Sequence, residues 1–387
     1  MSLPDRQDPS VSLVVATPEE VHEQQVLNSD EWKGALPLEA YLRREAMLVQ
    51  ERLTRDGGLT PWVLVHEHGD GRTVLSSCET INKKALVAVN GEVREVVCHG
   101  VCSVFCPPDY RGKGYAGRMI TDLGEKLRTW QAEESDSPFS VLWSDIGKQF
   151  YKARGWHPFP SAHISLHPSK TNISKTGLPS TRALKIADLE ELCALDAQLM
   201  RQCVAQKSTS GKTTVAILPD VVTLEWHHAR EGFVGKELYG KAPDIKGAVV
   251  ELDSGKRVWC IWTRMWYNSD PADPKGNTLH ILRLASDDQG LLDSEAKIAG
   301  PKKEEVAAAI AALLAAAQAQ ASEWNMGEVD IWNPSHLTIT AGRMLEETVD
   351  VVHREKDSIS SLRWYGAGHE NPAEEVEWIG NEKYAWC

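Results

Sequence analysis

One short stretch, Arg111-Gly-Lys-Gly-Tyr-Ala-Gly-Arg-Met-Ile120, most constrains what this chain can fold into. It follows an apolar run over residues 101–106 and a Pro-Pro-Asp-Tyr turn, and it opens an amphipathic segment over residues 119–130. A strand therefore leads into a glycine-bearing loop at the start of a helix. Main-chain N–H groups converge at such a helix start, and the positive end of the helix dipole favours anions there. The sequence predicts a site for a phosphate or a pyrophosphate.

The spacing of the loop residues excludes two common phosphate-binding motifs. A nucleotide-binding P-loop needs a glycine five residues before Gly-Lys-Ser or Gly-Lys-Thr, and a dinucleotide site needs G-x-G-x-x-G. The pattern here is R-x-x-G-x-A, carried by Arg111, Gly114 and Ala116. It resembles the [QR]-x-x-G-x-[GA] signature of the GNAT superfamily of acyl-CoA-dependent N-acyltransferases. The resemblance implies a loop that holds the pyrophosphate of CoA.

A second block of sequence supports the same family. Residues 139–143 are typical of a buried strand, and residues 144–157 predict a short helix that ends at Gly155. The string Phe150-Tyr-Lys-Ala-Arg-Gly-Trp156 is similar to the other GNAT hallmark, FYxKxGF, and it falls about thirty residues after the glycine loop. Two motifs in this order, each on the expected element, identify the chain as a member of the GNAT superfamily.

The order of predicted elements divides the chain in two. Strands at 11–16, 62–66, 73–77, 86–89, 93–98, 101–106 and 139–143, with a helical region over 17–52, match a GNAT core of mixed, mostly antiparallel sheet and flanking helices. We therefore expect an α/β (α+β) fold. Residues 1–166 form the predicted catalytic domain, 167–180 a linker, and 181–387 a second, degenerate GNAT-like domain. No R-x-x-G-x-A pattern follows the strand at 278–285, so this half should not bind CoA.

Composition narrows the functional classes further. The net charge of −13 argues against nucleic-acid binding, which needs basic patches. No signal-peptide pattern begins the chain, and the alanine-rich run at 306–321 is typical of a packed helix, so we expect a cytoplasmic protein without a membrane segment. The eight cysteines lack C-x-x-C or zinc-ligand spacing, which predicts no metal. The oligomeric state stays open.

Nearly the whole chain resembles the fungal lysine N6-acetyltransferases of lysine catabolism. The strings that carry this resemblance are Glu31-Trp-Lys-Gly-Ala-Leu-Pro, Cys78-Glu-Thr-Ile81, the block from Ser144 to Trp156, and the tail Glu377-Trp-Ile-Gly-Asn-Glu-Lys-Tyr-Ala-Trp386. The resemblance implies acetyl transfer from acetyl-CoA to the side-chain amine of free L-lysine, with the second domain capping the site. The two motifs by themselves imply only acyl transfer to an amine.

The motifs also assign site residues. Tyr151 stands where many GNAT enzymes carry the tyrosine that protonates the CoA thiolate; a packing role for it is the alternative. Main-chain groups of Val104 and Cys106 should pair with the pantetheine arm like an added strand, and Ser144 joins this cofactor-binding set. The pyrophosphate should bind the main chain of the loop, whose members are Arg111, Gly112, Lys113, Gly114, Tyr115 and Ala116.

The general base is less certain, and it is needed because a lysine amine with a pKa near 10.4 is almost wholly protonated at neutral pH. Many relatives carry Glu or His on the strand before the loop, where this chain has Gly100 and Cys102. His99 is one residue away and is the predicted base, provided that the strand bulges. The alternatives are Glu79, Glu31 and the C-terminal carboxylate at Cys387.

Three functional hypotheses remain open at this point. The first is the free-lysine acetyltransferase, in which an arginine should bind the substrate carboxylate; the sequence does not show which one. The second is a GNAT enzyme for another amine, such as a polyamine, a toxin amine or a protein lysine. The third is a non-catalytic acyl-CoA-binding protein.

Overall fold

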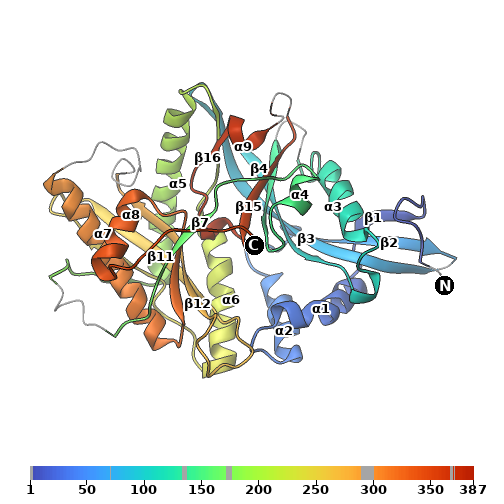
Figure 1. The fold of residues 1–387 in the computed structure, drawn as a ribbon, viewed down its shortest axis with the longest axis horizontal. Helices are drawn as coiled ribbons and strands as arrows, with labels where there is room; N and C mark the ends of the chain where they lie inside the picture. The colour runs from blue at the N-terminus through green and yellow to red at the C-terminus, as the bar shows by residue number, and fades with distance from the viewer. Residues whose placement is uncertain are drawn as a thin grey trace.

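In the computed structural model the chain forms two sheets side by side, and its C-terminus lies near the centre of the molecule (Figure 1). The structure describes residues 3–69, 71–132, 137–170, 177–288, 300–366, 369 and 371–387. The middle of the predicted linker, at 171–176, and the start of the segment expected to lack the glycine loop in the second half, at 289–299, therefore lie outside the described residues.

The first sheet has the strand order β1-β2-β3-β4-β5-β15-β6, with β9 beside β3 and β16 beside β9. Its pairs are antiparallel except β4 with β5 and β9 with β16, which are parallel. The mixed, mostly antiparallel sheet predicted from the motifs is thus confirmed. The strands are β1 (Val11–Val15), β2 (Leu59–His68), β3 (Gly71–Val89), β4 (Glu92–Phe105), β5 (Phe139–Ser144), β6 (His157–Pro158), β9 (Thr213–Ile217), β15 (Ile359–Trp364) and β16 (Val376–Trp378).

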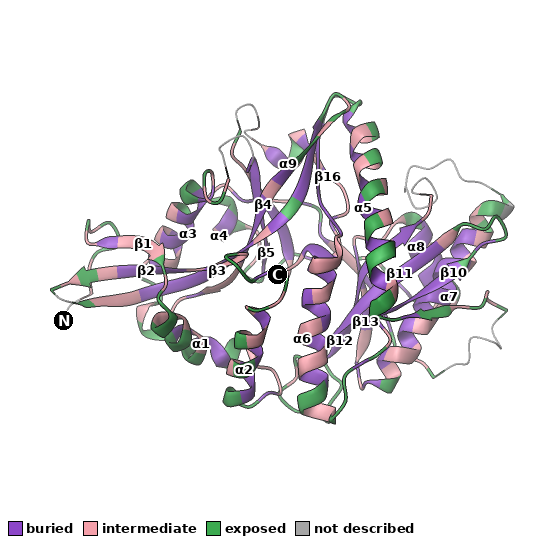
Figure 2. Cartoon of the chain, turned by 180° about the vertical axis from the view of Figure 1, so that it is seen from behind, coloured by how far each residue is buried: buried purple, intermediate pink, exposed green. Residues whose placement is uncertain are grey.

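The second sheet has the order β14-β7-β13-β12-β11-β10-β8. Here the parallel pair is β12 with β13, which repeats the arrangement of β4 and β5 in the first sheet. Strands of both sheets are mostly buried (Figure 2). The strands are β7 (Ala162–Leu166), β8 (Arg182–Leu184), β10 (Gly247–Glu251), β11 (Arg257–Met265), β12 (Thr278–Ser286), β13 (Glu328–Trp332) and β14 (Val352–His353).

The two halves of the chain contribute strands to each other's sheet. β9, β15 and β16, from the C-terminal half, belong to the first sheet, where β15 lies between β5 and β6. β7, from the N-terminal half, lies between β13 and β14 of the second sheet. The sheets therefore interleave along the sequence, and β7 lies in the second sheet although residues 162–166 precede the predicted linker. The division of the chain into domains at residues 166 and 181 therefore stays a prediction.

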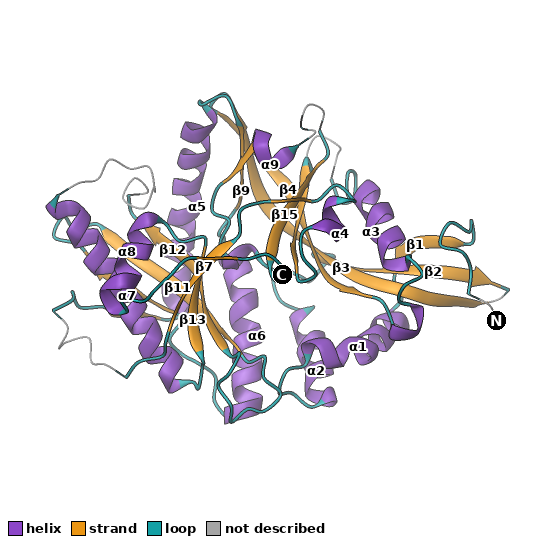
Figure 3. Ribbon diagram, viewed as in Figure 1, coloured by secondary structure: helices purple, strands orange, loops and turns teal. Residues whose placement is uncertain are grey.

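Helices cover both sheets (Figure 3). They are α1 (Pro18–Trp32), α2 (Leu38–Leu48), α3 (Tyr115–Lys126), α4 (Gln149–Lys152), α5 (Ile186–Ser208), α6 (Val221–Tyr239), α7 (Pro301–Glu323), α8 (His336–Leu345) and α9 (Pro372–Glu375), with short 3-10 turns η1 (Pro108–Tyr110) and η4 (Lys383–Ala385). α1 begins at a capping box in which Thr17 and Glu20 exchange hydrogen bonds, as its N-cap, Pro and acidic first turn predicted. α6 stands between the second sheet and α2.

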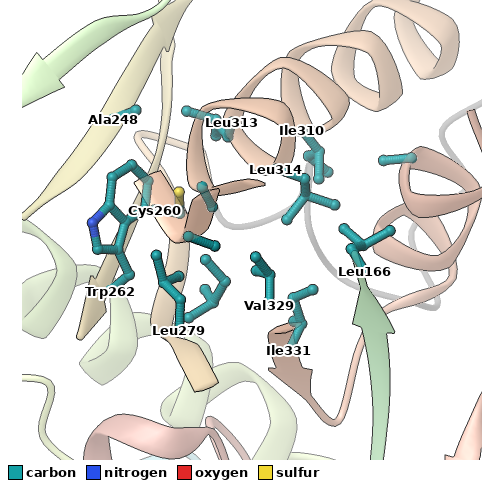
Figure 4. Packing of buried hydrophobic residues seen from close by; sticks show 14 of the residues in the cluster. Leu166, Ala248, Cys260, Trp262, Leu279, Ile310, Leu313, Leu314, Val329 and Ile331 are labelled. Carbon is teal, nitrogen blue, oxygen red and sulfur yellow. The ribbon is translucent and has the colours of Figure 1, made fainter. Parts of the chain in front are cut away.

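The hydrophobic core between α7 and the second sheet shows why α7 is rich in alanine. Ile310, Leu313 and Leu314 project from the helix onto Leu279, Val329 and Ile331 of the sheet, and Leu166 of the exchanged strand β7 completes the cluster (Figure 4). Small side chains let the helix approach the strands closely. By length and composition the segment Lys302–Glu323 of this helix could also cross a membrane, and 61% of its most apolar window is buried inside the protein.

Several predicted elements differ from the observed ones. Residues 73–77 and 86–89 belong to one long strand, β3, and residues 93–98 and 101–106 belong almost entirely to β4. Helix α4 begins at Gln149, not at Ser144, because Gly147 adopts a φ of 78° and its N–H bonds to Lys356 O, which holds the preceding residues in a turn. A hairpin turn at Asn90-Gly91, with both residues at positive φ, joins β3 to β4.

Candidate active site

The candidate site begins where β4 and β5 diverge. The two strands pair in parallel from Cys98 and Phe139 to Val101 and Leu142, and the pairing ends there although both strands continue. This opening leads into a cavity of about 640 Å³, a volume typical of ligand sites. Its walls come from α1, α2, β3, β4, β5, α4, α6 and the last two residues of the chain. A site thus forms between segments that are far apart in the sequence.

The glycine loop lies at the edge of this cavity. Gly112 and Gly114 have φ values of 79° and 84°, which other residues rarely adopt, and α3 begins directly after Gly114. Arg111 and Ala116 line the cavity, while Gly112 and Lys113 are exposed to solvent. The first N–H groups of α3 have no partner within the helix. The loop therefore has the geometry of an anion site next to an open cavity, and its assignment to the CoA pyrophosphate stays a prediction.

The remaining residues of the predicted cofactor set divide into two groups. Val104 and Cys106 line the cavity from the end of β4. Tyr115 and Ser144 do not: the Tyr115 hydroxyl donates to Pro4 O at 2.6 Å from the core, and the Ser144 hydroxyl donates to Gly147 O at 2.6 Å. The side chains of these two residues are therefore engaged within the protein and do not face the cavity.

Tyr151 lies in the cavity wall, as its predicted role requires. It is held on α4, packs edge-on against Phe150 with 4.9 Å between ring centroids, and is 7% exposed. Burial raises the pKa of its phenol above the usual range, so the hydroxyl keeps its proton at neutral pH. A neutral phenol in the wall of a ligand cavity can act as a proton donor.

His99 lies outside the cavity lining, and the structure gives no support to its predicted role as base. Its Nε2 lies 3.3 Å from Gln131 Oε1, and burial lowers its pKa to about 4. The strand does bulge, with Ser103 at a φ of 52° and a register shift opposite Ser77 and Glu79, but this bulge comes after His99 and leaves its ring in place.

Glu79, one of the alternative bases, does line the cavity. It lies on β3 directly opposite Cys102 of β4. Burial is the main cause that raises the pKa of its carboxyl to about 7, the nearby Glu45 raises it further, and a hydrogen bond from Ser103 opposes both. A carboxylate with a pKa near the working pH is well matched to general-base catalysis.

The other two alternatives are also in the cavity wall. Glu31 lies near the entrance and pairs with Arg111 at 3.2 Å, where both side chains are half exposed. Cys387 also lines the cavity, and a Cβ at Gly100 would lie 2.7 Å from Cys387 Sγ, so the tail packs directly against the main chain of Gly100.

Sequence reasoning missed the part of the wall that comes from other elements. α2 contributes Tyr41, Arg44 and Glu45, and α6 of the second half contributes Trp226 and Arg230. The one available signal for α6 was the N-cap Asp220, which accepts from Thr223 N. Buried residues lie on several sides of α6, so the helix lacks the apolar stripe that predicts an amphipathic helix.

Among the described residues, no group of three or more His, Cys, Asp or Glu side chains is placed to hold a metal ion. The arrangement is one that suits acyl transfer. A thioester that enters between β4 and β5 meets open main-chain edges, a neutral phenol and a carboxyl that titrates near pH 7. These are the groups needed to polarise the carbonyl, accept the proton of an attacking amine and protonate the leaving thiolate.

Known proteins share this fold. A conserved protein from Enterococcus faecalis is 14% identical, with a TM-score of 0.51 over 92% of this chain and 72% of that one. The N-myristoyltransferase of Saccharomyces cerevisiae, solved with bound myristoyl-CoA, is 11% identical, with a TM-score of 0.51 over 96% and 83% of the two chains. At these identities the likeness shows the fold alone, and it confirms the predicted fold class.

Sequence comparison places the chain more closely. A protein of Yarrowia lipolytica named lysine acetyltransferase is 23% identical over 65% of this chain and 72% of its own length. The sequence profile of the LYC1 GNAT-like C-terminal domain matches residues 163–387, more than half of the chain. The chain therefore belongs to the LYC1-like family of the GNAT superfamily, which the two motifs predicted at the level of the superfamily.

Proposed function

We propose that this chain transfers the acetyl group of acetyl-CoA to the side-chain amine of free L-lysine, which gives N6-acetyl-L-lysine and CoA. The GNAT fold implies acyl-CoA binding. The lysine acceptor is supported by the name of the Yarrowia relative. The single observation that carries the proposal is that one cavity joins the open strand edge and glycine loop to a carboxyl with a pKa of about 7.

In the proposed reaction Glu79 is the general base. The acceptor amine is an ammonium ion at neutral pH, and losing its first proton to solvent costs about 4–5 kcal/mol for a pKa near 10.4. The neutral nitrogen then attacks the thioester carbonyl, and the new C–N bond makes its remaining N–H acidic enough for Glu79 to accept the second proton. Glu79 replaces His99 as our choice because its carboxylate lines the cavity and the His99 ring does not.

Tyr151 is the proposed acid. When the tetrahedral intermediate collapses, the C–S bond breaks and the CoA thiolate takes the phenolic proton. A main-chain N–H at the unpaired end of β4 polarises the thioester carbonyl in the preceding step. Val104 and Cys106 provide that strand edge, and the loop from Arg111 to Ala116 holds the pyrophosphate.

A panel of amines tests this proposal. Purified protein with acetyl-CoA is offered L-lysine, L-ornithine, spermidine and a lysine-containing peptide, and free CoA release and the mass of each product are measured. L-lysine should give the highest kcat/KM, with the acetyl group on the side-chain nitrogen. Preference for spermidine or the peptide would replace the acceptor in the proposal, and binding of acetyl-CoA without any turnover would make the chain a non-catalytic binding protein.

A further inference from the structure

The cavity contains a cation from the second half of the chain that no family motif predicts. Arg230 lies on α6 and lines the cavity, with Trp226 one turn before it. α6 is fixed against the first half by ion pairs at both ends: Arg43 with Glu237 at 2.9 Å, and Arg52 with Glu225 at 3.0 Å. Arg230 therefore lies on a helix that packs against α2 and the segment that follows it.

Arg230 differs from the other arginines of the cavity wall in having no partner. Arg111 pairs with Glu31 at 3.2 Å and Arg44 with Glu45 at 2.6 Å. No residue that the structure describes forms a hydrogen bond or an ion pair with the guanidinium of Arg230. Arg230 is half-buried in the cavity wall, and a partly desolvated cation without a protein partner favours an anion from outside the chain.

Burial, and then the nearby charge of Arg44, lower the pKa of Arg230 to about 10. The side chain therefore stays protonated at neutral pH, although its surroundings disfavour the protonated form relative to water. The groups that face it electrostatically are Arg44, Tyr267, Glu45 and Tyr41. None of these belongs to the glycine loop, which is the predicted site of the CoA pyrophosphate.

Two carboxyl groups near Arg230 differ in their partners and in their pKa. Glu45 is ion-paired to Arg44, whereas Glu79 titrates near pH 7 and responds to the charge of Glu45. An unpaired cation, a nearby carboxylate and a base in one cavity match the three polar ends of an α-amino acid that carries a second amine: its carboxylate, its α-ammonium group and its reactive nitrogen.

We propose that Arg230 binds the α-carboxylate of the acceptor and thereby restricts the enzyme to amino acids over simple diamines. This inference rests on the proposed function, because it assumes that the acceptor is a free amino acid. The planar guanidinium offers two parallel N–H donors to a carboxylate, a geometry that lysine in its place lacks. Glu45 is the corresponding contact for the α-ammonium group.

The test compares L-lysine with cadaverine, which is lysine without its carboxylate, in wild type, Arg230→Gln and Arg230→Lys. For L-lysine, Arg230→Gln should lower kcat/KM by about 100-fold, mainly through KM, because the contact is the same in the ground state and in the transition state. For cadaverine the same variant should stay within about twofold of wild type, and Arg230→Lys should recover only part of the loss on L-lysine.

Arg43→Gln is the matched control, because Arg43 also joins α2 to α6 but its side chain is exposed and does not line the cavity. It should change neither substrate. An equal loss of kcat/KM for L-lysine and cadaverine in Arg230→Gln, or no loss for L-lysine, overturns the inference while leaving lysine acetylation intact.

Failure of the proposed function gives a different result. If ornithine but not lysine is acetylated and Arg230→Gln still discriminates ornithine from putrescine, the acceptor is wrong and the role of Arg230 stands. If no amine is acetylated, calorimetric titration of L-lysine into the protein with CoA decides. Binding that Arg230→Gln abolishes supports the inference, and no binding to wild type overturns it together with the proposed function.

Discussion

The two sheets each contain one parallel strand pair that diverges, and the chain fills only one of the two openings. β4 and β5 separate after Val101 and Leu142 and lead into the open cavity of about 640 Å³. β12 and β13 separate after Ile281 and Ile331. In that second opening Leu284 N donates to Glu382 Oε2 at 3.0 Å, so the strand edge is already satisfied by the chain's own tail.

The tail is held in the second opening by several buried contacts. Tyr384 is fully buried and its hydroxyl donates to Ile217 O at 2.6 Å, while Asn333 donates to Asn381 O at 2.6 Å. Arg283 binds both Asp196 and Glu382. A smaller cavity of about 310 Å³ remains beside the tail. The two openings thus differ in two respects: the tail enters the second, and a glycine loop follows β4 at the first.

The same tail links the two openings. After η4 it continues to Trp386 and Cys387, which line the cavity of the first opening. His227 of α6 bonds to Tyr384 O at 2.9 Å, which fixes the tail against the helix that carries Arg230. The tail segment at the second opening therefore contacts the helix that forms one wall of the first cavity.

The largest expected effect is the loss of activity when Glu79 of the first opening is replaced, compared with Glu382 of the second. Glu79→Gln removes the proposed base and should lower kcat by about 10²- to 10⁴-fold. In wild type kcat/KM should rise with pH through about 7, because Glu79 must lose its proton to act as a base, and the variant should lose this rise. Stopped assays between pH 5.5 and 9 measure both effects.

Glu382→Gln is the control in the other opening. It should lower stability without removing the ionisation near pH 7, because Glu382 contacts Arg283 and Leu284 and does not line the first cavity. The Glu79→Gln variant should have the opposite effect on stability. The raised pKa of Glu79 means that the folded state disfavours its ionised carboxylate, so above pH 7 the variant should be at least as stable as wild type. An unchanged pH profile in Glu79→Gln would exclude it as the base.

The second contrast concerns stability. Tyr384→Ala should lower the free energy of unfolding by about 3–5 kcal/mol, because it empties a buried aromatic site where the tail fills the second opening. Tyr384→Phe, which leaves Ile217 O without its donor, should cost about 1–3 kcal/mol. Urea unfolding followed by tryptophan fluorescence gives both values. A loss below 1 kcal/mol in Tyr384→Ala would show that the tail is not held there.

The third prediction separates proton donation by Tyr151 from coenzyme binding in the first opening. Tyr151→Phe keeps the packing of the ring but removes the proposed acid, so kcat should fall by about 100-fold while CoA affinity stays nearly unchanged. The measurement combines steady-state kinetics with CoA titration calorimetry. If kcat equals that of wild type, the Tyr151 hydroxyl is a packing group and the thiolate leaves unprotonated.

The smallest effect is expected at the glycine loop. Gly114→Ala forces a side chain into a φ of 84° and within 2.8 Å of Arg6 Cδ, which should weaken acyl-CoA binding by about tenfold. Gly240→Ala is the matched control in the second half, with a φ of 69° and nothing within 4 Å of the added atom. It should carry similar backbone strain but leave CoA affinity unchanged. Equal affinities in the two variants would argue against the loop as the binding site.

How far the sequence predicts this molecule depends on whether a feature is local. The glycine loop, the strand before it and the position of Tyr151 were predicted because a few adjacent residues determine each of them. The continuous β3 and β4 were predicted as fragments, since polar residues such as Asn82 and Lys83 interrupt the apolar pattern within one strand.

The rest of the site depends on contacts between distant segments. The sequence patterns of β7, β9, β15 and β16 do not show that each of these strands joins the sheet of the other half. Arg230 lies more than a hundred residues from the glycine loop, and its lack of a partner is visible only in three dimensions. Glu79 was one of four candidate bases, and only its burial beside Glu45 separates it from the others.

Calorimetric titration of the purified chain with acetyl-CoA tests the central contrast most directly, because its stoichiometry counts the openings that accept the coenzyme. The account predicts one molecule bound per chain, with the heat diminished in Gly114→Ala and unaltered in Gly240→Ala. Two molecules per chain would mean that the tail does not close the second opening, and no binding would contradict the assignment of the first.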